Sequence, residues 1–370
     1  MTTEQRPHPP DPAADELRLS VGDPGELLAA VPHLLGFRPE DSLVLVAVHG
    51  SGDGAQRSST RSGGPHRRLG TVARADLPAP DDVEELVAGC AARMVPGGPS
   101  EVIAVVVTDD GPDGGPPRAD VADAVSVAFR ARGVPPLARL WAPRLETGAP
   151  WRCYPPCDCG GRVGRVDDGA VAAASAVSGR VTYGSRNELE ATLDPLPTSP
   201  RLAGLITAER EAAVLDRELG GPSAARRDLA AVVGARAEVA DRRVLGDAEL
   251  ARQAVALGVP AVRDLVMGWA VDPEPADVAA AEQLWTLLAR SLPAPSVAEP
   301  AVLLACALIA GGGSALVGVA LERARRADPG HRLARLVGAL VSSGADATAL
   351  RRLMAESSAD AAARLRGRAA

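Results

Sequence analysis

The sequence contains no lysine, so all 40 of its basic residues are arginine. A Schiff-base lysine and the lysine of a phosphate-binding loop are therefore excluded. Aromatic residues are also scarce, with 4 Trp, 2 Tyr and 2 Phe in 370 residues, which argues against a surface that stacks nucleic-acid bases. Residues 1–200 carry 19 Arg against 27 Asp and Glu, and residues 201–370 carry 21 against 20. Neither part has the basic excess typical of nucleic-acid binding, so we expect no nucleic-acid partner.

Uncharged apolar runs long enough to cross a bilayer are nearly absent as well. Residues 301–321 form one such run, long enough to cross a bilayer, but Gly311, Gly312 and Gly313 interrupt it. The run therefore predicts two packed helices, and we expect no membrane partner. The first residues are polar and proline-rich, without the apolar core of a secretory signal, and residues 1–16 are expected to be disordered. Together with the low cysteine count, this predicts a cytoplasmic protein.

A chain of this length with 46% hydrophobic residues predicts two domains. In residues 17–193, strand-like and helix-like segments alternate, which is typical of an α/β domain with a mixed sheet flanked by helices. The apolar run 42–48 has the pattern of a strand covered on both faces, and the β-branched run 101–108 is expected at the sheet centre. Residues 49–68 lack periodicity and predict a flexible loop.

The segment 194–200 holds three prolines and predicts a linker between the domains. Beyond it, residues 201–370 show helical spacing and no convincing strand, so we expect an all-α domain. Residues 299–342 have the helix–turn–helix rhythm of tetratricopeptide hairpins, with breaks at Gly311–Gly313 and at Asp328-Pro329-Gly330. Such hairpins commonly bind proteins, so a protein partner is expected at the helical domain.

Residues 27–44, which read LLAAVPHLLGFRPEDSLV, resemble the opening motif of an actinobacterial family known only as a domain of unknown function, the type numbered 4192. Further segments are similar to the same family: Thr71–Leu77, Trp151–Tyr154, Ser185–Leu189, Ala320–Ala324 and Asp328–Gly330. The resemblance covers most of residues 17–345. It implies a shared architecture, and it implies no activity.

The densest group of chemically reactive side chains is Cys153, Cys157 and Cys159, beside Pro155 and Pro156. Three thiolates within seven residues would bind zinc if a fourth ligand came from elsewhere in the fold. The alternative is a proline turn whose cysteines are unpaired thiols, with a labile disulfide as a further option. The spacing is not that of two CxxC pairs, so the turn is the favoured interpretation.

A second candidate site lies at the ends of predicted strands. Asp109 and Asp110 directly follow the expected central strand, and His49 ends another strand. Ligands of open α/β sheets bind at the carboxyl ends of strands, where paired carboxylates hold Mg²⁺ or act as acid and base. An ordinary solvated loop has the same composition, so both interpretations stay open.

No catalytic constellation is recognised, since there is no G-x-S-x-G elbow and no G-x-G-x-x-G loop. The first hypothesis is therefore a non-enzymatic protein-interaction or regulatory module. The alternative is an enzyme, or a regulator that binds a nucleotide or metabolite, with its ligand near His49, Asp109 and Asp110.

Overall fold

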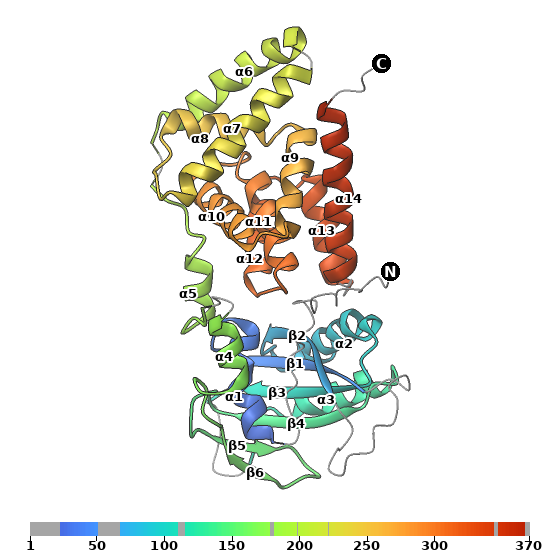
Figure 1. Ribbon diagram of the computed structural model, residues 1–370. Coiled ribbons are helices and arrows are strands. Elements are labelled where there is room, and N and C mark those ends of the chain that lie inside the picture. The colour runs from blue at the N-terminus through green and yellow to red at the C-terminus, as the bar shows by residue number, and fades with distance from the viewer. Residues whose placement is uncertain are drawn as a thin grey trace, which may run out of the picture. The chain divides into compact units, whose positions relative to one another are not determined.

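The computed structural model describes residues 23–50, 67–109, 115–177, 181–197, 199–220, 222–343 and 347–366. The chain divides into two compact units, Met1–Thr182 and Tyr183–Ala370 (Figure 1). The predicted disorder over 1–16 lies outside the described residues, as does most of the predicted loop 49–68. The ends of that loop are described, and His49 and Arg68 each belong to a strand.

The first unit contains a six-stranded mixed sheet with the order β2-β1-β3-β4-β5-β6. Its strands are β1 (Ser42–His49), β2 (Arg68–Asp76), β3 (Glu101–Val107), β4 (Pro136–Ala142), β5 (Pro150–Cys153) and β6 (Gly160–Arg162). β1 runs antiparallel to both β2 and β3, β3 is parallel to β4, and β5 is antiparallel to β4 and β6. The predicted mixed sheet is thus confirmed, with β3 inside it. β6 was not predicted, because its Gly-Gly-Arg sequence lacks β-forming side chains.

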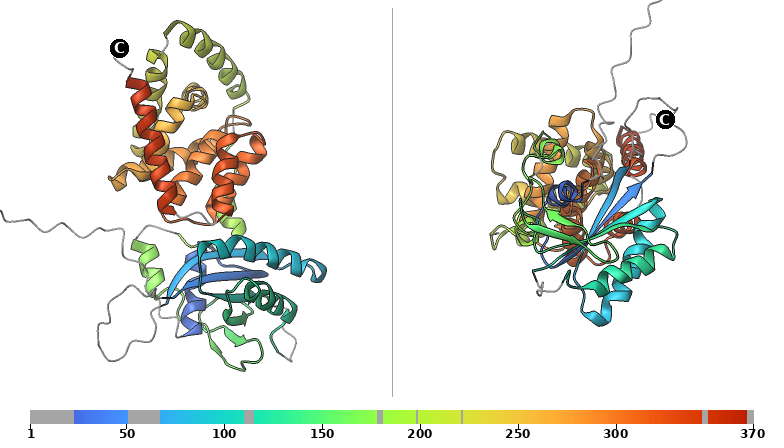
Figure 2. Two further views of the ribbon diagram at one scale, coloured as in Figure 1. Left: turned by 90° about the vertical axis from the view of Figure 1, so that its right-hand side faces the viewer. Right: turned by 90° about the horizontal axis from the view of Figure 1, so that it is seen from below.

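Helices cover both faces of this sheet, as the uninterrupted apolar strands predict. Helices α2 (Val83–Met94) and α3 (Ala119–Arg130) share a core with the side chains of Leu43 and Leu45 on one face. The alternate residues of β1 point to the other face and are equally buried. There α1 (Pro24–Leu35) contacts α4 (Ala170–Val177) (Figure 2). Short 3-10 turns at 80–82 and 95–97 flank α2.

The first helix ends where its sequence signals predict. The side chain of Asp23 accepts a hydrogen bond from the Gly25 amide at 2.8 Å and caps the helix. Gly36 closes it with a φ of 80°, a left-handed conformation that glycine adopts without a steric penalty. Phe37 follows Gly36 and is buried, and β1 begins five residues later at Ser42.

The second unit is helical, and no strand occurs in its described part beyond residue 200. Its helices are α5 (Arg186–Ala191), α6 (Leu202–Gly220), α7 (Pro222–Ala240), α8 (Asp247–Ala256), α9 (Pro260–Met267), α10 (Pro275–Ser291), α11 (Ala298–Ala310), α12 (Leu316–Ala327), α13 (Arg332–Ser342) and α14 (Ala347–Arg366). A 3-10 turn, Gly268–Val271, follows α9. The breaks before α12 and α13 fall at the glycine run and at the Asp-Pro-Gly turn, as predicted.

Helix α11 is the centre of this unit. Nearly all of its residues are buried, because α10, α12, α13 and α14 pack around it. This packing explains the uncharged run in the sequence as a core helix that ends before Gly311. In the described part of the chain, no single helix has the length and hydropathy needed to cross a membrane. Only the pair Asp247–Ala256 and Pro260–Val271 reaches that threshold, jointly and with a bend of 95°.

The proline-rich segment 194–197 is attached to the helical unit. The Leu196 amide donates to the carbonyl oxygen of Arg290 at 2.8 Å, and the Arg290 guanidinium donates back to the carbonyl of Asp194 at 3.1 Å. Leu193 and Leu202, which flank the segment, are both in the core of this unit. The division between the units thus precedes the predicted linker.

Candidate functional site

The structure does not bring the predicted strand-end residues together. In the antiparallel pairing of β1 with β3, Ser42 lies opposite Val107 and Val48 lies opposite Glu101. His49 is therefore at the end of the sheet where β3 begins, while Asp109 is at the end where β3 finishes. The carboxyl ends of two neighbouring strands lie at the same edge of a sheet only when the strands are parallel. The predicted site required β1 and β3 to be parallel, and they are antiparallel. The ring of His49 lies over Gly70 of β2, where no side chain competes for the space.

The end of β3 is engaged in structural contacts. The Thr108 hydroxyl donates to a carboxylate oxygen of Asp41 at 2.9 Å, and Asp41 has a φ of 38°, a left-handed conformation that is unusual outside glycine. Asp109 is 79% exposed and forms a 3.7 Å ion pair with the exposed Arg144. Asp110 lies outside the described residues. The described part of this edge thus ties β1 to β3 and presents Asp109 to solvent.

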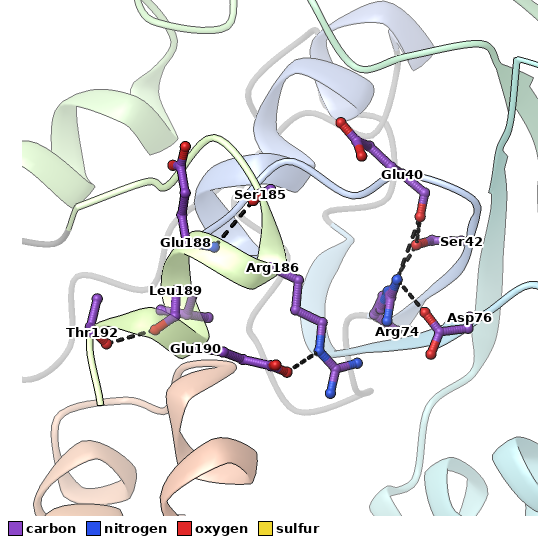
Figure 3. A network of polar contacts seen from close by, with 10 residues as sticks. All are labelled: Glu40, Ser42, Arg74, Asp76, Ser185, Arg186, Glu188, Leu189, Glu190 and Thr192. Atoms are coloured by element: carbon purple, nitrogen blue, oxygen red, sulfur yellow. Dashed lines mark hydrogen bonds and ion pairs between the residues drawn. The ribbon is translucent and has the colours of Figure 1, made fainter. Parts of the chain in front are cut away.

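Arg74 contacts two residues of the opening motif, Phe37 and Ser42, and these contacts give both residues a structural role. Its Nε donates to the hydroxyl of the fully buried Ser42 at 2.8 Å, and its guanidinium pairs with Asp76 at 2.6 Å (Figure 3). The same guanidinium lies 6.0 Å from the ring centroid of Phe37, within cation–π range. Phe37 and Ser42 both belong to the motif, so this part of the resemblance describes a structural joint between β1 and β2.

The three hairpin cysteines do converge. Cys153 and Cys159 form a disulfide, and the Cys157 sulfur lies 2.7 Å from that of Cys159. All three sulfurs lie within 4.8 Å of one another. The sequence analysis favoured three unpaired thiols and named a disulfide as a further option. The structure has the disulfide, and it leaves Cys157 as a free thiol.

One cavity of the helical unit has a volume of about 500 Å³, within the range of small-molecule sites. Its walls are α5, the segment 193–196, the end of α10 with the turn after it, and α12. Its lining is rich in arginine: Arg186, Arg290, Arg323 and Arg326. We call it the arginine pocket.

Two of these arginines have unusual partners. Arg290 donates to the carbonyl of Asp194, and Arg323 donates to the carbonyl of Ala289 at 2.6 Å. Within the described chain neither has a carboxylate at ion-pair distance. Burial lowers the pKa of the Arg323 guanidinium; the Asp194 carboxylate counteracts this, and the neighbouring Arg290 lowers the pKa further. Arginine remains protonated in proteins, so the two cations face the cavity with incomplete compensation.

The other two arginines form ion pairs with carboxylates. Arg186 pairs with Glu190 at 2.6 Å along α5. Arg326 pairs with Glu322 at 3.0 Å along α12, and it shares this carboxylate with Arg325, which lies 2.9 Å from it. The Ser185 hydroxyl caps the N-terminus of the short helix α5, where it accepts a hydrogen bond from the Glu188 amide at 3.1 Å (Figure 3). The site therefore has an ion-paired arginine at each side, and between them a pair of cations that is only partly compensated by the Asp194 carboxylate.

Sequence reasoning missed this pocket, because its residues are spread from Arg186 to Ala327 and match no short motif. A signal did exist. Arg186 lies in the Ser185–Leu189 segment and Arg323 in the Ala320–Ala324 segment, and both segments carry the family resemblance. The fold brings these two distant segments to one cavity.

The two described histidines that lie within or next to helices have structural partners. The His33 ring donates from Nε2 to the Val166 carbonyl at 2.8 Å and therefore accepts the Thr182 hydroxyl at Nδ1, also at 2.8 Å. The Nδ1 of His331 accepts from the Ala334 amide and caps α13, which leaves Nε2 to donate to Glu299 at 3.2 Å. Both rings are thus fixed by contacts within their own unit.

The class of protein is now defined: a mixed α/β unit followed by an all-helical unit that contains an arginine-lined pocket. A family model described as "Domain of unknown function (DUF4192)" matches residues 24–347. The chain belongs to this family. No curated protein and no solved structure matches the chain.

Proposed function

We propose that the protein is a non-enzymatic regulatory module, acting in the cytoplasm, whose helical unit binds a small anionic ligand in the arginine pocket. The observation that carries this proposal is the pair Arg290 and Arg323, two cations that face a cavity of about 500 Å³ with only carbonyl oxygens as hydrogen-bond partners. Carboxylate and phosphate oxygens are the acceptors that guanidinium groups bind best, often in a bidentate manner.

Binding is favoured over catalysis by the chemistry of the lining. The side chains that line the pocket include no hydroxyl, thiol, imidazole or amine. Two of the three lining carboxylates, Glu190 and Glu322, already pair with arginines and are poorly placed to act as free bases. The third, Asp194, interacts electrostatically with Arg323. A ligand class with several acceptor oxygens, such as a di- or tricarboxylate or a phosphorylated metabolite, complements this lining.

The proposal is tested by thermal unfolding of the full chain with inorganic phosphate, pyrophosphate or citrate, against chloride at equal ionic strength. A ligand at about 100 times its Kd stabilises the folded state by about 2.7 kcal/mol, so we expect a clear rise in Tm with at least one anion. R290Q and R323Q should abolish that rise, whereas R352Q, which changes an exposed arginine outside the pocket, should keep it. The proposal is wrong if no anion raises Tm, or if R323Q responds as the unaltered protein does.

A variant that fills the pocket tests whether binding requires the volume of the cavity as well as the charge of its arginines. Gly318 lines the pocket, and a Cβ built there would meet no atom within 4 Å. G318L should therefore block ligand entry and keep every arginine. G234L, at an exposed helical glycine with equally open surroundings, is the matched control and should retain the response.

A second candidate partner is an acidic peptide. A groove of about 640 Å³ on α12 and α13 is lined by Arg325, Arg332 and Arg335 beside Leu336, which is 51% exposed. Arg325 already pairs with Glu322 at 2.9 Å, so Arg332 and Arg335 are the guanidinium groups that would bind the acidic residues of a peptide. Together with the exposed Leu336, they complement a peptide of alternating acidic and apolar residues. A fluorescently labelled Glu-Leu repeat peptide should bind, and the double variant R332E/R335E should lose it while R352E does not. Equal binding by all three proteins would contradict this candidate.

A further inference from the structure

We propose that the reduced protein binds one Zn²⁺ ion through the thiolates of Cys153, Cys157 and Cys159. This site is independent of the arginine pocket, since it lies on the β5–β6 hairpin of the other unit. The three sulfurs already lie within 4.8 Å of one another. Thiolates around a tetrahedral zinc ion, with Zn–S bonds near 2.3 Å, are separated by roughly 3.8 Å, so small side-chain rotations suffice to form the site.

The third cysteine favours a metal over a purely structural disulfide. A disulfide needs only Cys153 and Cys159, whose Cα atoms are 5.5 Å apart. The backbone nevertheless brings Cys157 against Cys159, with 2.7 Å between the sulfurs, on the exposed surface. A trithiolate centre uses all three sulfurs, with water or the adjacent Asp158 carboxylate in the fourth position.

The loop that holds the sulfurs is fixed by the surrounding fold. The Cys153 amide donates to the Cys159 carbonyl at 2.8 Å, which closes the hairpin at its base. The Arg139 guanidinium, anchored by a 2.6 Å ion pair with Asp123, donates to the carbonyl of Pro155 inside the loop. The strands are only 4 and 3 residues long, and β6 is exposed throughout. Hairpins of this size gain much of their stability from a crosslink or a metal.

The other cysteines of the chain are poor candidates and therefore useful controls. Burial raises the pKa of Cys306 to about 12 and also raises the pKa of Cys90. Zinc binds the thiolate, and a raised pKa makes it harder for the metal to displace the thiol proton. Cys157, by contrast, is exposed.

Reduction of the Cys153–Cys159 disulfide takes two electrons and two protons from a dithiol, which becomes a cyclic disulfide. Zinc binding then replaces the protons of the three thiols, so three protons are released. The centre carries a net charge of −1 with water as the fourth ligand and −2 with the Asp158 carboxylate. Oxidation and metal binding therefore compete for the same sulfurs.

The test uses the full chain, reduced with dithiothreitol and desalted without oxygen, and then titrated with Co²⁺ followed by Zn²⁺. We expect one equivalent of Co²⁺ with a thiolate-to-cobalt charge-transfer band, displaced by one equivalent of Zn²⁺. C90A should behave identically, whereas C157S and C159S should lose the band with unchanged far-UV circular dichroism. The air-oxidised protein should bind no cobalt.

Three results would overturn the proposal. The first is a reduced protein that shows no charge-transfer band. The second is a band of equal intensity in C157S, which would mean that the third sulfur is not a ligand. The third is equal binding by the oxidised protein, which would place the metal elsewhere.

Discussion

Arg74 in the α/β unit is largely buried and Arg323 in the helical unit is partly buried, and their partners differ. Arg74 bonds to a hydroxyl, a carboxylate and a carbonyl oxygen, and its plane lies near an aromatic ring. Arg323 bonds to one carbonyl and faces a cavity. The first arrangement joins two strands, although Nη1 of Arg74 is buried and has no hydrogen-bond partner among the described residues. The second leaves the rest of the Arg323 guanidinium facing the cavity. Under the proposed function, the sheet unit is the scaffold and the helical unit carries the binding site.

The largest expected effect tests whether the two units have separate cores. Trp285 is 1% exposed and stacks on Trp269 with 5.7 Å between ring centroids. W285A should cost about 3–5 kcal/mol in the free energy of unfolding, because it leaves a cavity in the helical core. Hydrogen exchange should accelerate in α10 and α11 and stay unchanged in β1 and β3. Faster exchange in β1 and β3 as well would show that the units unfold together.

The next effect concerns Arg74. R74A should cost about 2–3 kcal/mol, since it removes hydrogen bonds to buried groups and leaves the Ser42 hydroxyl with one partner fewer. R130A, at an exposed arginine of the same unit, should change stability by less than about 0.5 kcal/mol. Urea denaturation measures both. Equal midpoints for R74A and R130A would contradict the structural role of Arg74.

A smaller effect is expected at Asp41. D41A should cost about 1–2 kcal/mol, because it removes the acceptor for Thr108 at a φ of 38°, where alanine is disfavoured. D41N should lose less, since asparagine tolerates this conformation and still offers an oxygen. The order of denaturation midpoints, D41N above D41A, checks this prediction. The reverse order would mean that the hydrogen bond contributes little.

The smallest expected effect is a gain. G318A should stabilise the helical unit by about 0.5–1 kcal/mol, since alanine favours the helix and a Cβ at this position meets open space. A rise in Tm of the ligand-free protein is the readout. A fall in Tm would mean that Gly318 is needed for packing as well as for access to the pocket.

Much of the fold could be predicted from sequence because its signals are local. Asp23 and Gly36 mark the ends of α1, the β-branched run 101–108 marks the inner strand, and His331 marks the start of α13. The location of the strand-end residues could not be predicted from sequence, because it depends on whether β1 and β3 run parallel or antiparallel. A single antiparallel pairing, β1 with β3, separates His49 from Asp109.

The arginine pocket could not be predicted for a different reason. Its charge state depends on which arginines meet carboxylates and which meet carbonyl oxygens, and helix packing decides this. Arg326 and Arg323 are three residues apart on one helix, yet Glu322 pairs with Arg326 and with Arg325, and Arg323 bonds to a carbonyl oxygen instead. The amino-acid sequence alone does not show which of these two arginines is paired with a carboxylate. The cysteine cluster is the intermediate case, because its short spacing predicted proximity and left the bonding open.

The most direct test of the account is hydrogen–deuterium exchange of the full chain with and without citrate and, separately, pyrophosphate. The account predicts that at least one of these anions slows exchange in α5, at the end of α10 and in α12, and leaves the sheet unchanged. Protection at the ends of β1 or β3, or protection nowhere in the chain, would contradict it.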